Sequence, residues 1–306
     1  MFKQSLLIII ILCITLCTKA QIAKPYRYKD IVFSDITIDK DLSYARGANP
    51  DEKKSFLFDL YQPKDDRSSP RPLIIWMHGG GFKFGTKEAK GIQIWSKTFA
   101  QRGYVCAAIN YRLSKKDPLF NFSELQKSCY YAVQDVKTAI EYFKEHHDEY
   151  NIDPDKIILA GNSAGGLIAL QTTYSTDAGL AKMAGIADTG SNHQGALKVA
   201  AVINFWGAIF DLNWLKNAHV PVVSVLGNRD NIVPPTHKSA PLYGGVDIHK
   251  QADVLGIPNE LKVFDGYSHE LQKHFNPLFS ANKGTQKRWL EAGQFAADFL
   301  HNSLFK

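Results

Sequence analysis

A serine between two glycines gives the clearest chemical signal in this chain, because residues 161–165 read Gly-Asn-Ser-Ala-Gly. The spacing matches the pattern G-x-S-x-G, in which the serine stands on a sharp turn between a strand and a helix. An apolar run at 157–160 precedes the motif, and a helix-like run at 167–170 follows it. Glycines two residues to either side leave room for so tight a turn. The pattern predicts a nucleophilic hydroxyl on Ser163.

Three consecutive glycines form a second motif, His78-Gly79-Gly80-Gly81-Phe82, which follows an apolar run. Glycines at the end of a buried strand let the backbone turn tightly and expose amide hydrogens. We expect the amides of Gly80, Gly81 and Ala164 to form an oxyanion hole, which stabilises the negative charge of a tetrahedral intermediate. Neither a G-x-G-x-x-G nor a Walker pattern is present, so the segment is not read as a phosphate cradle. We expect His78 to orient this loop and not to act as a base.

The two motifs together resemble those of a known superfamily. The sequence HGGGF at 78–82 and GNSAGG at 161–166 is similar to the esterase and lipase branch of the α/β-hydrolases, which includes the hormone-sensitive-lipase-like enzymes and the carboxylesterases. The resemblance covers nearly the whole chain after residue 20, because the order of strands and the order of motifs both fit. It implies a catalytic triad in the order serine, acid, histidine, with the acid after a buried strand.

Asp230 occupies the position at which the resemblance implies the acid. It follows the apolar run 222–226, and Val233-Pro234 resembles the usual sequel to the acid in this superfamily. Many members carry a histidine before the glycine at this point, whereas this chain has a leucine there. The rival carboxylates are Asp211, which comes too early, and Asp265, which lies only four residues before the expected histidine.

His269 is the expected base, because it follows the last strand in a G-x-x-H pattern that resembles the superfamily. His274 is the nearest competitor. The remaining histidines lie in helices or insertions, where we expect solvated or packed imidazoles: His146, His147, His193, His219, His237, His249 and His301. In this triad His269 takes the proton of Ser163 during attack, and Asp230 orients the imidazole and stabilises its cation. The chemistry requires no metal ion and no organic cofactor.

Strand-like and helix-like segments alternate along the chain, which indicates a mostly parallel central sheet with helices on both faces, the α/β-hydrolase fold. Two early strands have an antiparallel character. The later strands are too apolar to be half-exposed. The expected strands are 31–38, 55–61, 73–77, 105–109, 157–160, 200–205, 222–226 and 261–264, and the expected helices are 87–102, 123–146, 167–174 and 286–300. Two insertions, 175–198 and 231–259, are expected over the carboxyl edge of the sheet, where ligands bind.

The first twenty residues have the features of a signal peptide. A lysine precedes an apolar run at 6–17, and a small-residue cleavage site ends at Ala20. The run spans 12 residues, whereas a membrane span needs roughly 20. We therefore expect a secreted or periplasmic protein, with one α/β-hydrolase domain at 21–306 and no membrane span in its mature form. A lipoprotein anchor through Cys17 fits less well, because a bulky leucine precedes it.

The charge of +6 at pH 7 is spread along the chain, and its lysine pairs at 53–54 and 115–116 are isolated. No basic run of the nucleic-acid-binding type is present, so we expect no nucleic-acid partner. Cys106 and Cys129 have no C-x-x-C neighbour, which argues against zinc binding and thioredoxin chemistry. They either form a disulfide, which export would permit, or remain as two buried thiols.

These observations favour a secreted carboxylic-ester hydrolase that acts on short-chain acyl esters, with a small molecule or an acylated carbohydrate as substrate. Two alternatives stay open at this point. One is a serine peptidase or amidase with the same triad, and the other is a binding protein on an inactive hydrolase scaffold, since a fold alone does not determine function. Phe82 and Trp206 stand at strand ends, where we expect them to line the substrate pocket.

Overall fold

The structure is a computed structural model that describes residues 25–45, 52–187, 197–238, 242–276 and 281–306. The expected signal peptide at 1–20 lies outside these residues and stays a prediction. Within the described ranges, no helix combines the length and the apolar character that crossing a membrane requires.

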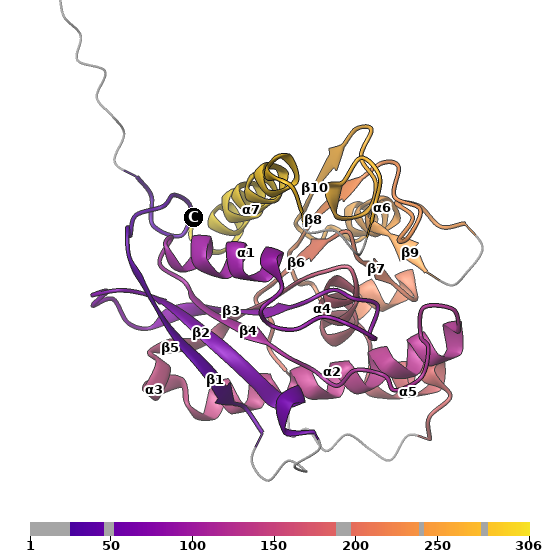
Figure 1. The fold of residues 1–306 in the computed structure, drawn as a ribbon, viewed down its shortest axis with the longest axis horizontal. Helices are drawn as coiled ribbons and strands as arrows, with labels where there is room; N and C mark the ends of the chain where they lie inside the picture. Colours follow the sequence, from indigo (N-terminus) through magenta and orange to yellow (C-terminus); the bar gives the residue numbers. More distant parts are fainter. Residues whose placement is uncertain (1–24, 46–51, 188–196, 239–241, 277–280) are drawn as a thin grey trace, which may run out of the picture.

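An eight-stranded sheet forms the centre of the molecule (Figure 1). Its strands lie in the order β1-β2-β4-β3-β5-β6-β8-β10. The first two strands run antiparallel to their neighbours, and the others pair in parallel. The strands are β1 (Ile36–Ser43), β2 (Leu57–Pro63), β3 (Arg71–Met77), β4 (Val105–Ile109), β5 (Ile152–Asn162), β6 (Ala201–Phe205), β8 (Val222–Gly227) and β10 (Asn259–Phe264). The expected parallel core is confirmed, as is the antiparallel character of the two early strands.

The first expected strand is displaced along the chain. We expected a strand at 31–38, whereas β1 begins at Ile36. The amides of Val32 and Phe33 donate to the carbonyl of Gln101, just after the end of a helix. These residues are therefore tied to that helix end and not to the sheet. Most residues of β1 are exposed and polar, so the apolar periodicity that reveals an inner strand is missing from this edge strand.

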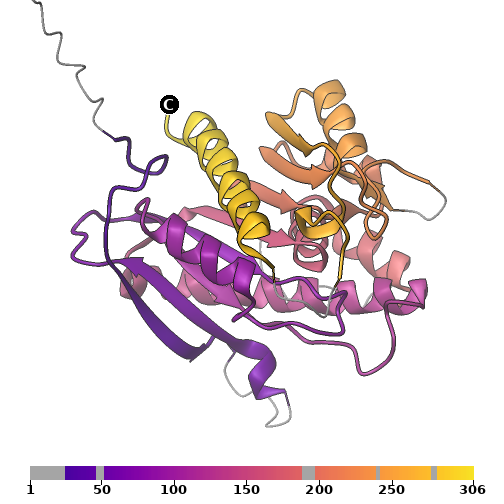
Figure 2. The same ribbon diagram turned by 45° about the horizontal axis from the view of Figure 1, so that its top comes forward.

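Helices cover both faces of the sheet (Figures 1 and 2). On one face, α1 (Lys90–Ala100) contacts α7 (Lys283–Leu304). On the other face lie α2 (Phe122–Glu145), α4 (Ala164–Tyr174), α5 (Asp177–Ala184) and α6 (Gly245–Leu255), together with a short helix, α3 (His147–Tyr150). Two buried apolar clusters, one on each face of the sheet, form the core.

The helix α2 begins slightly earlier than we expected. Its cap is the side chain of Asn121, which accepts a hydrogen bond from the amide of Glu124 at 3.1 Å. We had placed the start of this helix at Ser123. Asparagine is among the residues that cap helices most strongly, because its side-chain oxygen satisfies an amide that has no partner within the helix. The apolar positions of α2 then face the core at helical spacing, as with Val133, Val136 and Ile140.

A small second sheet lies beyond the carboxyl end of β6. It pairs β7 (Ala208–Ile209) with β9 (Tyr243–Gly244) in antiparallel fashion, and the short 3-10 helix η2 (Leu212–Asn217) follows β7. The segment 242–259 supplies both β9 and α6. This part of the second insertion therefore carries regular structure of its own.

The two cysteines that we considered as a disulfide are free thiols. Cys106 belongs to the apolar cluster that packs against α1 and α7. Cys129 belongs to the cluster beneath α2, on the opposite face of the sheet. Burial raises the pKa of both thiols far above the ordinary value, so neither is a reactive thiolate.

Candidate active site

Ser163 stands in the turn between β5 and α4, with a backbone φ of 53°. Its amide donates to the carbonyl of Phe205 at 2.9 Å, which ties the turn to β6. The flanking glycines are required by space. A Cβ atom on Gly161 would lie 2.4 Å from the carbonyl carbon of Gly165, and one on Gly165 would lie 2.1 Å from the carbonyl oxygen of Met77. The sequence therefore forces the serine into a strained, left-handed conformation that only small neighbours allow.

The structure brings Ser163, His269 and Asp230 together. The hydroxyl of Ser163 donates to Nε2 of His269 at 2.9 Å. The Nδ1 group of the same imidazole donates to Oδ2 of Asp230 at 2.7 Å. All three side chains are buried, although they come from the carboxyl ends of three different strands. Parallel strands place these ends at a common edge of the sheet, which is how residues so distant in sequence meet.

Asp230 is held on both of its carboxylate oxygens. Oδ1 accepts the amides of Ile232 and Val233, each at 2.9 Å, while Oδ2 faces His269. The turn that follows β8 thus fixes the carboxylate in the orientation that the imidazole needs.

The rival residues lie elsewhere. Asp211 caps η2 through the amide of Asn213 at 2.9 Å. Asp265 accepts from the side-chain amide of Asn228 at 2.6 Å. His274 is exposed and lies beyond the residues of the triad. None of these three hydrogen-bonds to His269 or Ser163 among the described residues.

His269 belongs to a short 3-10 helix, η3 (His269–Leu271), whose backbone is strained. Glu270 and Leu271 both have positive φ angles, 55° and 56°. Conformations of this kind persist only where surrounding structure holds them. The amide of Ser268 donates to the carbonyl of Gln272 at 2.7 Å, which closes the loop on itself.

Helix α7 holds this histidine loop from outside. Nε of Arg288 donates to the carbonyl of Leu271 at 2.7 Å, and Nε1 of Trp289 donates to the carbonyl of Glu270 at 2.8 Å. The guanidinium of Arg288 also lies 4.2 Å from the ring centre of Tyr267, on the other side of His269. Two neighbouring residues of α7 therefore contact the loop on both sides of the imidazole. No local sequence pattern marks a contact between α7 and this loop, so these two residues are absent from the predicted site.

Burial raises the pKa of Glu270, whereas its neighbours His269 and Gln272 act in the opposite direction. Its Oε2 accepts a hydrogen bond from Gln272 at 3.2 Å. A second carboxyl group thus follows the imidazole directly in sequence, another residue that we did not expect at the site.

The glycine loop lies against the nucleophile turn. A Cβ on Gly79 would approach the side chain of Asn162 at 2.8 Å and Cβ of Ser163 at 3.3 Å. Gly80 and Gly81 have φ angles of 113° and 59°, which L side chains rarely adopt. Among the described residues, no protein acceptor takes the amide hydrogen of either glycine. Ala164 begins α4, and the first amides of a helix have no partner within it.

His78 holds the glycine loop from the buried side. Its Nδ1 group donates to the carbonyl of Gly79 at 2.7 Å, and its ring stacks on Tyr111 at 4.3 Å. The hydroxyl of Tyr111 donates to the carbonyl of His78 at 2.8 Å. Burial lowers the pKa of His78 to about 4. The imidazole is therefore neutral at pH 7 and faces the loop, not the triad.

The structure does not bring the two expected pocket residues to an open cleft. Phe82 is buried in the core against Tyr111. Trp206 is buried beside Trp95 and Phe205 on the face of α1 and α7. Both have positive φ angles, and each belongs to one of the two buried core clusters. Their contact with substrate stays a prediction.

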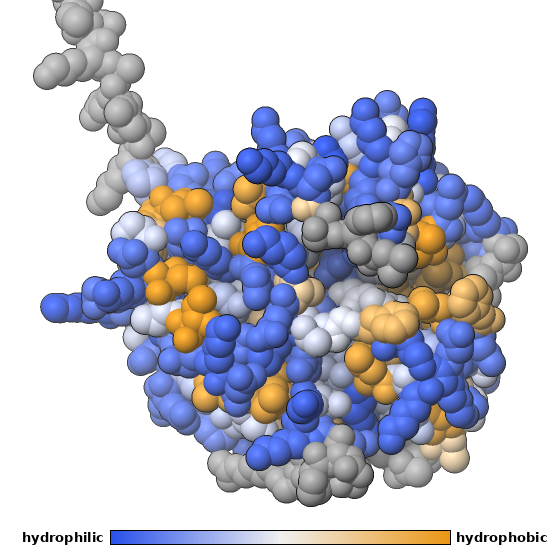
Figure 3. Space-filling view, viewed as in Figure 1, coloured by the Kyte–Doolittle hydropathy of each residue, from blue (hydrophilic) through white to orange (hydrophobic). Residues whose placement is uncertain are grey.

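Exposed apolar residues lie on the glycine loop and on the segment that contacts it. Phe84, Leu119 and Phe120 are 62%, 48% and 90% exposed. Leu119 lies over Gly81, so that a Cβ on this glycine would collide with its side chain. Figure 3 shows apolar side chains on the right-hand part of one face of the molecule, with others on its left-hand part. The exposed phenylalanine two residues after the HGGGF motif was the signal in the sequence that could have indicated these residues.

No group of three histidine, cysteine or acidic side chains within the described part of the chain is arranged to hold a metal ion. The functional groups gathered at the sheet edge are the hydroxyl, the imidazole, the carboxylate and the amides of the glycine loop.

The fold defines the class of protein, the α/β-hydrolase superfamily. Residues 58–221, more than half of the chain, match the family model BD-FAE. The chain belongs to the BD-FAE family.

Curated relatives carry the names of ester hydrolases and of a deacetylase. The chain is 28% identical over 206 residues to the probable carboxylic ester hydrolase LipM of Mycobacterium tuberculosis, an alignment that covers 67% of this chain and 42% of LipM. It is 31% identical over 113 residues to arylacetamide deacetylase of Bos taurus, covering 36% of this chain and 26% of that protein. The chain thus spans less than half the length of these relatives.

Solved structures show the same fold. Esterase 2 of Thermogutta terrifontis, phosphorylated by paraoxon, superimposes with a TM-score of 0.61 at 23% identity and covers 89% of this chain and 96% of its own. The same esterase with bound propionate gives a TM-score of 0.60 at 22% identity, covering 87% and 94%. These structures confirm the α/β-hydrolase fold. The family match and the curated relatives support the esterase branch that the two motifs resemble.

Proposed function

We propose that this protein is a serine carboxylic-ester hydrolase that cleaves short-chain acyl esters, with Ser163 as nucleophile, His269 as base and Asp230 as the acid of the triad. The observation that carries the proposal is the unbroken hydrogen-bond chain from the serine hydroxyl through the imidazole to the carboxylate. A free serine hydroxyl is a weak nucleophile, and an adjacent base held by a third group activates it.

The reaction has two halves. In the first, the oxygen of Ser163 attacks the ester carbonyl carbon while its proton passes to Nε2 of His269. The tetrahedral intermediate then expels the alcohol, which receives the proton from His269, and an acyl-enzyme remains. In the second half, water loses a proton to His269 and attacks the acyl carbon. The carboxylic acid leaves, and the serine oxygen recovers its proton.

The amides of Gly80, Gly81 and Ala164 are proposed to receive the negative charge that develops on the carbonyl oxygen. The positive φ angles of the two glycines support this assignment, because they turn the loop next to the serine. Loss of one such donor typically lowers kcat by about 100- to 1,000-fold.

The apolar residues around Gly81 suggest where the acyl group lies. Leu119 contacts this glycine. Phe84 follows Gly81 by three residues, Phe120 follows Leu119 directly, and both phenylalanines are exposed. We assign the acyl side of the substrate to this surface. Small apolar acyl groups such as acetyl and butyryl match a surface of this kind, because burial of each additional methylene stabilises the complex by about 0.8 kcal/mol.

The expected export suggests a substrate outside the cytoplasm, and acylated carbohydrates are the class that we propose. The signal-peptide features of residues 1–20 support this location. The molecular mass of the protein that an exporting host secretes tests this export. If all of the exported protein still carries residues 1–20, cleavage of a signal peptide is contradicted. A panel of acetylated and feruloylated sugars, beside amides of the same acids, tests the substrate class.

The central test is the release of nitrophenol from nitrophenyl acetate. We expect Ser163→Ala to lower kcat by roughly a million-fold, because nucleophile and base act as a unit. Ser34→Ala makes the same chemical change at an exposed serine and serves as the matched control. Equal activity of the wild type and Ser163→Ala contradicts the assignment. Hydrolysis of amides as fast as that of esters identifies a peptidase or amidase instead.

A further inference from the structure

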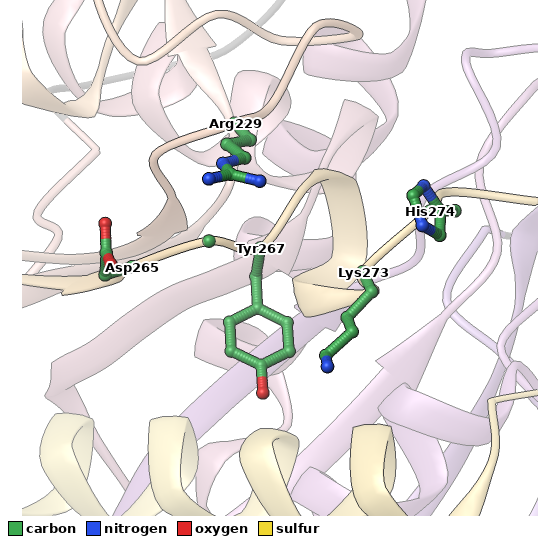
Figure 4. Close-up of a pocket in the computed structure, with 6 residues that line it drawn as sticks. Arg229, Asp265, Tyr267, Lys273 and His274 are labelled. Atoms are coloured by element: carbon green, nitrogen blue, oxygen red, sulfur yellow. The ribbon is translucent and has the colours of Figure 1, made fainter.

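A recess of about 370 Å³ lies beside the loops that carry Asp230 and His269. Its lining comes from the residue before the acid and from both sides of the histidine (Figure 4): Arg229, Asp265, Gly266, Tyr267, Lys273 and His274. The amide of Arg229 donates to the carbonyl of Tyr267 at 2.9 Å, so the two loops form one continuous wall. The recess is therefore built on the same backbone that positions the proposed acid and base.

The lining side chains are rich in positive charge and in hydrogen-bond donors. Arg229 and Lys273 are exposed, and neither side chain has an ion-pair or hydrogen-bond partner among the residues that the structure describes. The one carboxylate of the lining, Asp265, already accepts a hydrogen bond from Asn228 at 2.6 Å. Figure 4 shows its carboxylate turned away from Tyr267, whereas the ammonium group of Lys273 extends toward the side of that ring.

The hydroxyl of Tyr267 is a neutral donor on the α7 side of the loop, away from the guanidinium of Arg229 (Figure 4). It accepts a long hydrogen bond from Nη1 of Arg288 at 3.5 Å, which leaves its proton free to donate. The guanidinium of Arg288 also lies 4.2 Å from the ring centre, so a further positive charge stands next to this ring. A ligand that accepts hydrogen bonds and carries negative charge is complementary to such a site, and a planar carboxylate matches the guanidinium of Arg229.

The catalytic cycle indicates which part of a substrate reaches this recess. His269 must deliver its proton to the leaving alcohol, so the alcohol part of the ester faces the histidine loop. The acyl part is assigned to the apolar residues around Gly81, on a different loop. We infer that the recess binds a carboxylate carried by the alcohol part of the substrate, as in an acylated sugar acid. This inference rests on the proposed ester hydrolysis.

The test uses two esters that differ only in this charge, acetylated galacturonic acid and acetylated galactose, with release of acetate as the measurement. We expect the wild type to show a kcat/KM about tenfold higher for the acidic ester, the effect of one charge-assisted hydrogen bond. In the double variant Arg229→Gln/Lys273→Gln the ratio of the two kcat/KM values should fall to about one. Added salt should lower the wild-type ratio, because ions screen exposed charges.

Arg67→Gln/Lys250→Gln removes the same charge at two other exposed positions and serves as the matched control, which should keep the wild-type ratio. A ratio that is equal in all three proteins overturns the inference while leaving the ester hydrolysis intact. Failure of every protein to release acetate from either sugar ester, while nitrophenyl acetate is still hydrolysed, overturns the inference and the carbohydrate substrate class. Failure on nitrophenyl acetate as well overturns the proposed function itself. Free galacturonate should inhibit hydrolysis of the neutral ester competitively, and noncompetitive inhibition overturns the assignment to the alcohol site.

Discussion

At the residue scale, the site combines a buried histidine–carboxylate hydrogen bond with a strained turn. Asp230 has both oxygens occupied, one by His269 and the other by two amides of its own turn. Ser163 has a positive φ that presents its hydroxyl to the imidazole. Each of the two is fixed by its own local backbone, so neither needs the other in order to reach its position.

Asp230→Asn tests the orienting role of the carboxylate. The substitution keeps the size of the side chain, but its amide no longer stabilises the imidazolium, and it favours the tautomer that cannot accept the serine proton. We expect kcat for nitrophenyl acetate to fall by about 10⁴.

The control is Asp211→Asn, which makes the same change at the cap of η2 and should keep the wild-type kcat. Thermal unfolding of both proteins completes the comparison. A fall in kcat that is equal in both variants, or one explained by unfolding of Asp230→Asn, contradicts the assigned role.

Among the elements of the fold, α7 has a function beyond covering the sheet. Its residues Arg288 and Trp289 donate to two successive carbonyls of the histidine loop. Trp289 also accepts at its own carbonyl from Nε1 of Trp95 in α1, at 2.8 Å. The helix is thus connected both to the core beneath it and to the strained loop above it.

Trp289→Phe tests this connection, because it keeps most of the packing but removes the donor to the carbonyl of Glu270. An unpaired buried carbonyl costs about 1–3 kcal/mol, and the strained loop then relaxes. We expect kcat to fall by roughly tenfold with KM almost unchanged, since the imidazole moves while the substrate surface remains.

Lys287→Ala, at the exposed position before Arg288, serves as the control in the same helix. The change in kcat and the change in KM, measured separately, decide the outcome. A variant that loses stability but keeps the wild-type kcat shows that Trp289 acts only as a packing residue.

At the scale of the whole molecule, the glycine loop is anchored by a histidine that the fold keeps neutral. Burial lowers the pKa of His78 to about 4, from about 6.5 in an unfolded chain. Between these two values the unfolded chain binds the proton more readily than the folded protein does. The contribution of His78 to the free energy of unfolding is therefore fully present above about pH 6.5. It decreases as the pH falls toward 4.

The free energy of unfolding should fall by roughly 3 kcal/mol across this pH window on account of His78. Urea unfolding of the wild type at pH 7 and at pH 4.5 measures the loss. His78→Asn has no titrating ring and should be less stable at pH 7 but clearly less sensitive to acid. If both proteins lose the same free energy between the two pH values, another group is responsible.

The sequence predicts the fold and the site best where the residue types leave few choices for the backbone. Gly161 and Gly165 are needed by any serine on such a turn, and the runs of buried apolar residues leave few alternatives to inner strands. The first strand escaped prediction because β1 is an exposed, polar edge strand whose position depends on its partner β2. The hydrogen bonds from Arg288 and Trp289 to the histidine loop depend on tertiary packing, which no local sequence pattern indicates.

The exposed strand β1 also bears on how the molecules behave together. It lies at the outer end of the sheet, and its pairing with β2 is irregular between Asp39 and Leu42. Between these two residues stand Lys40 and Asp41, so charges of both signs line the open edge. A second molecule that tried to extend the sheet at this side would meet charges and an interrupted ladder, a combination that opposes fibril growth and aggregation.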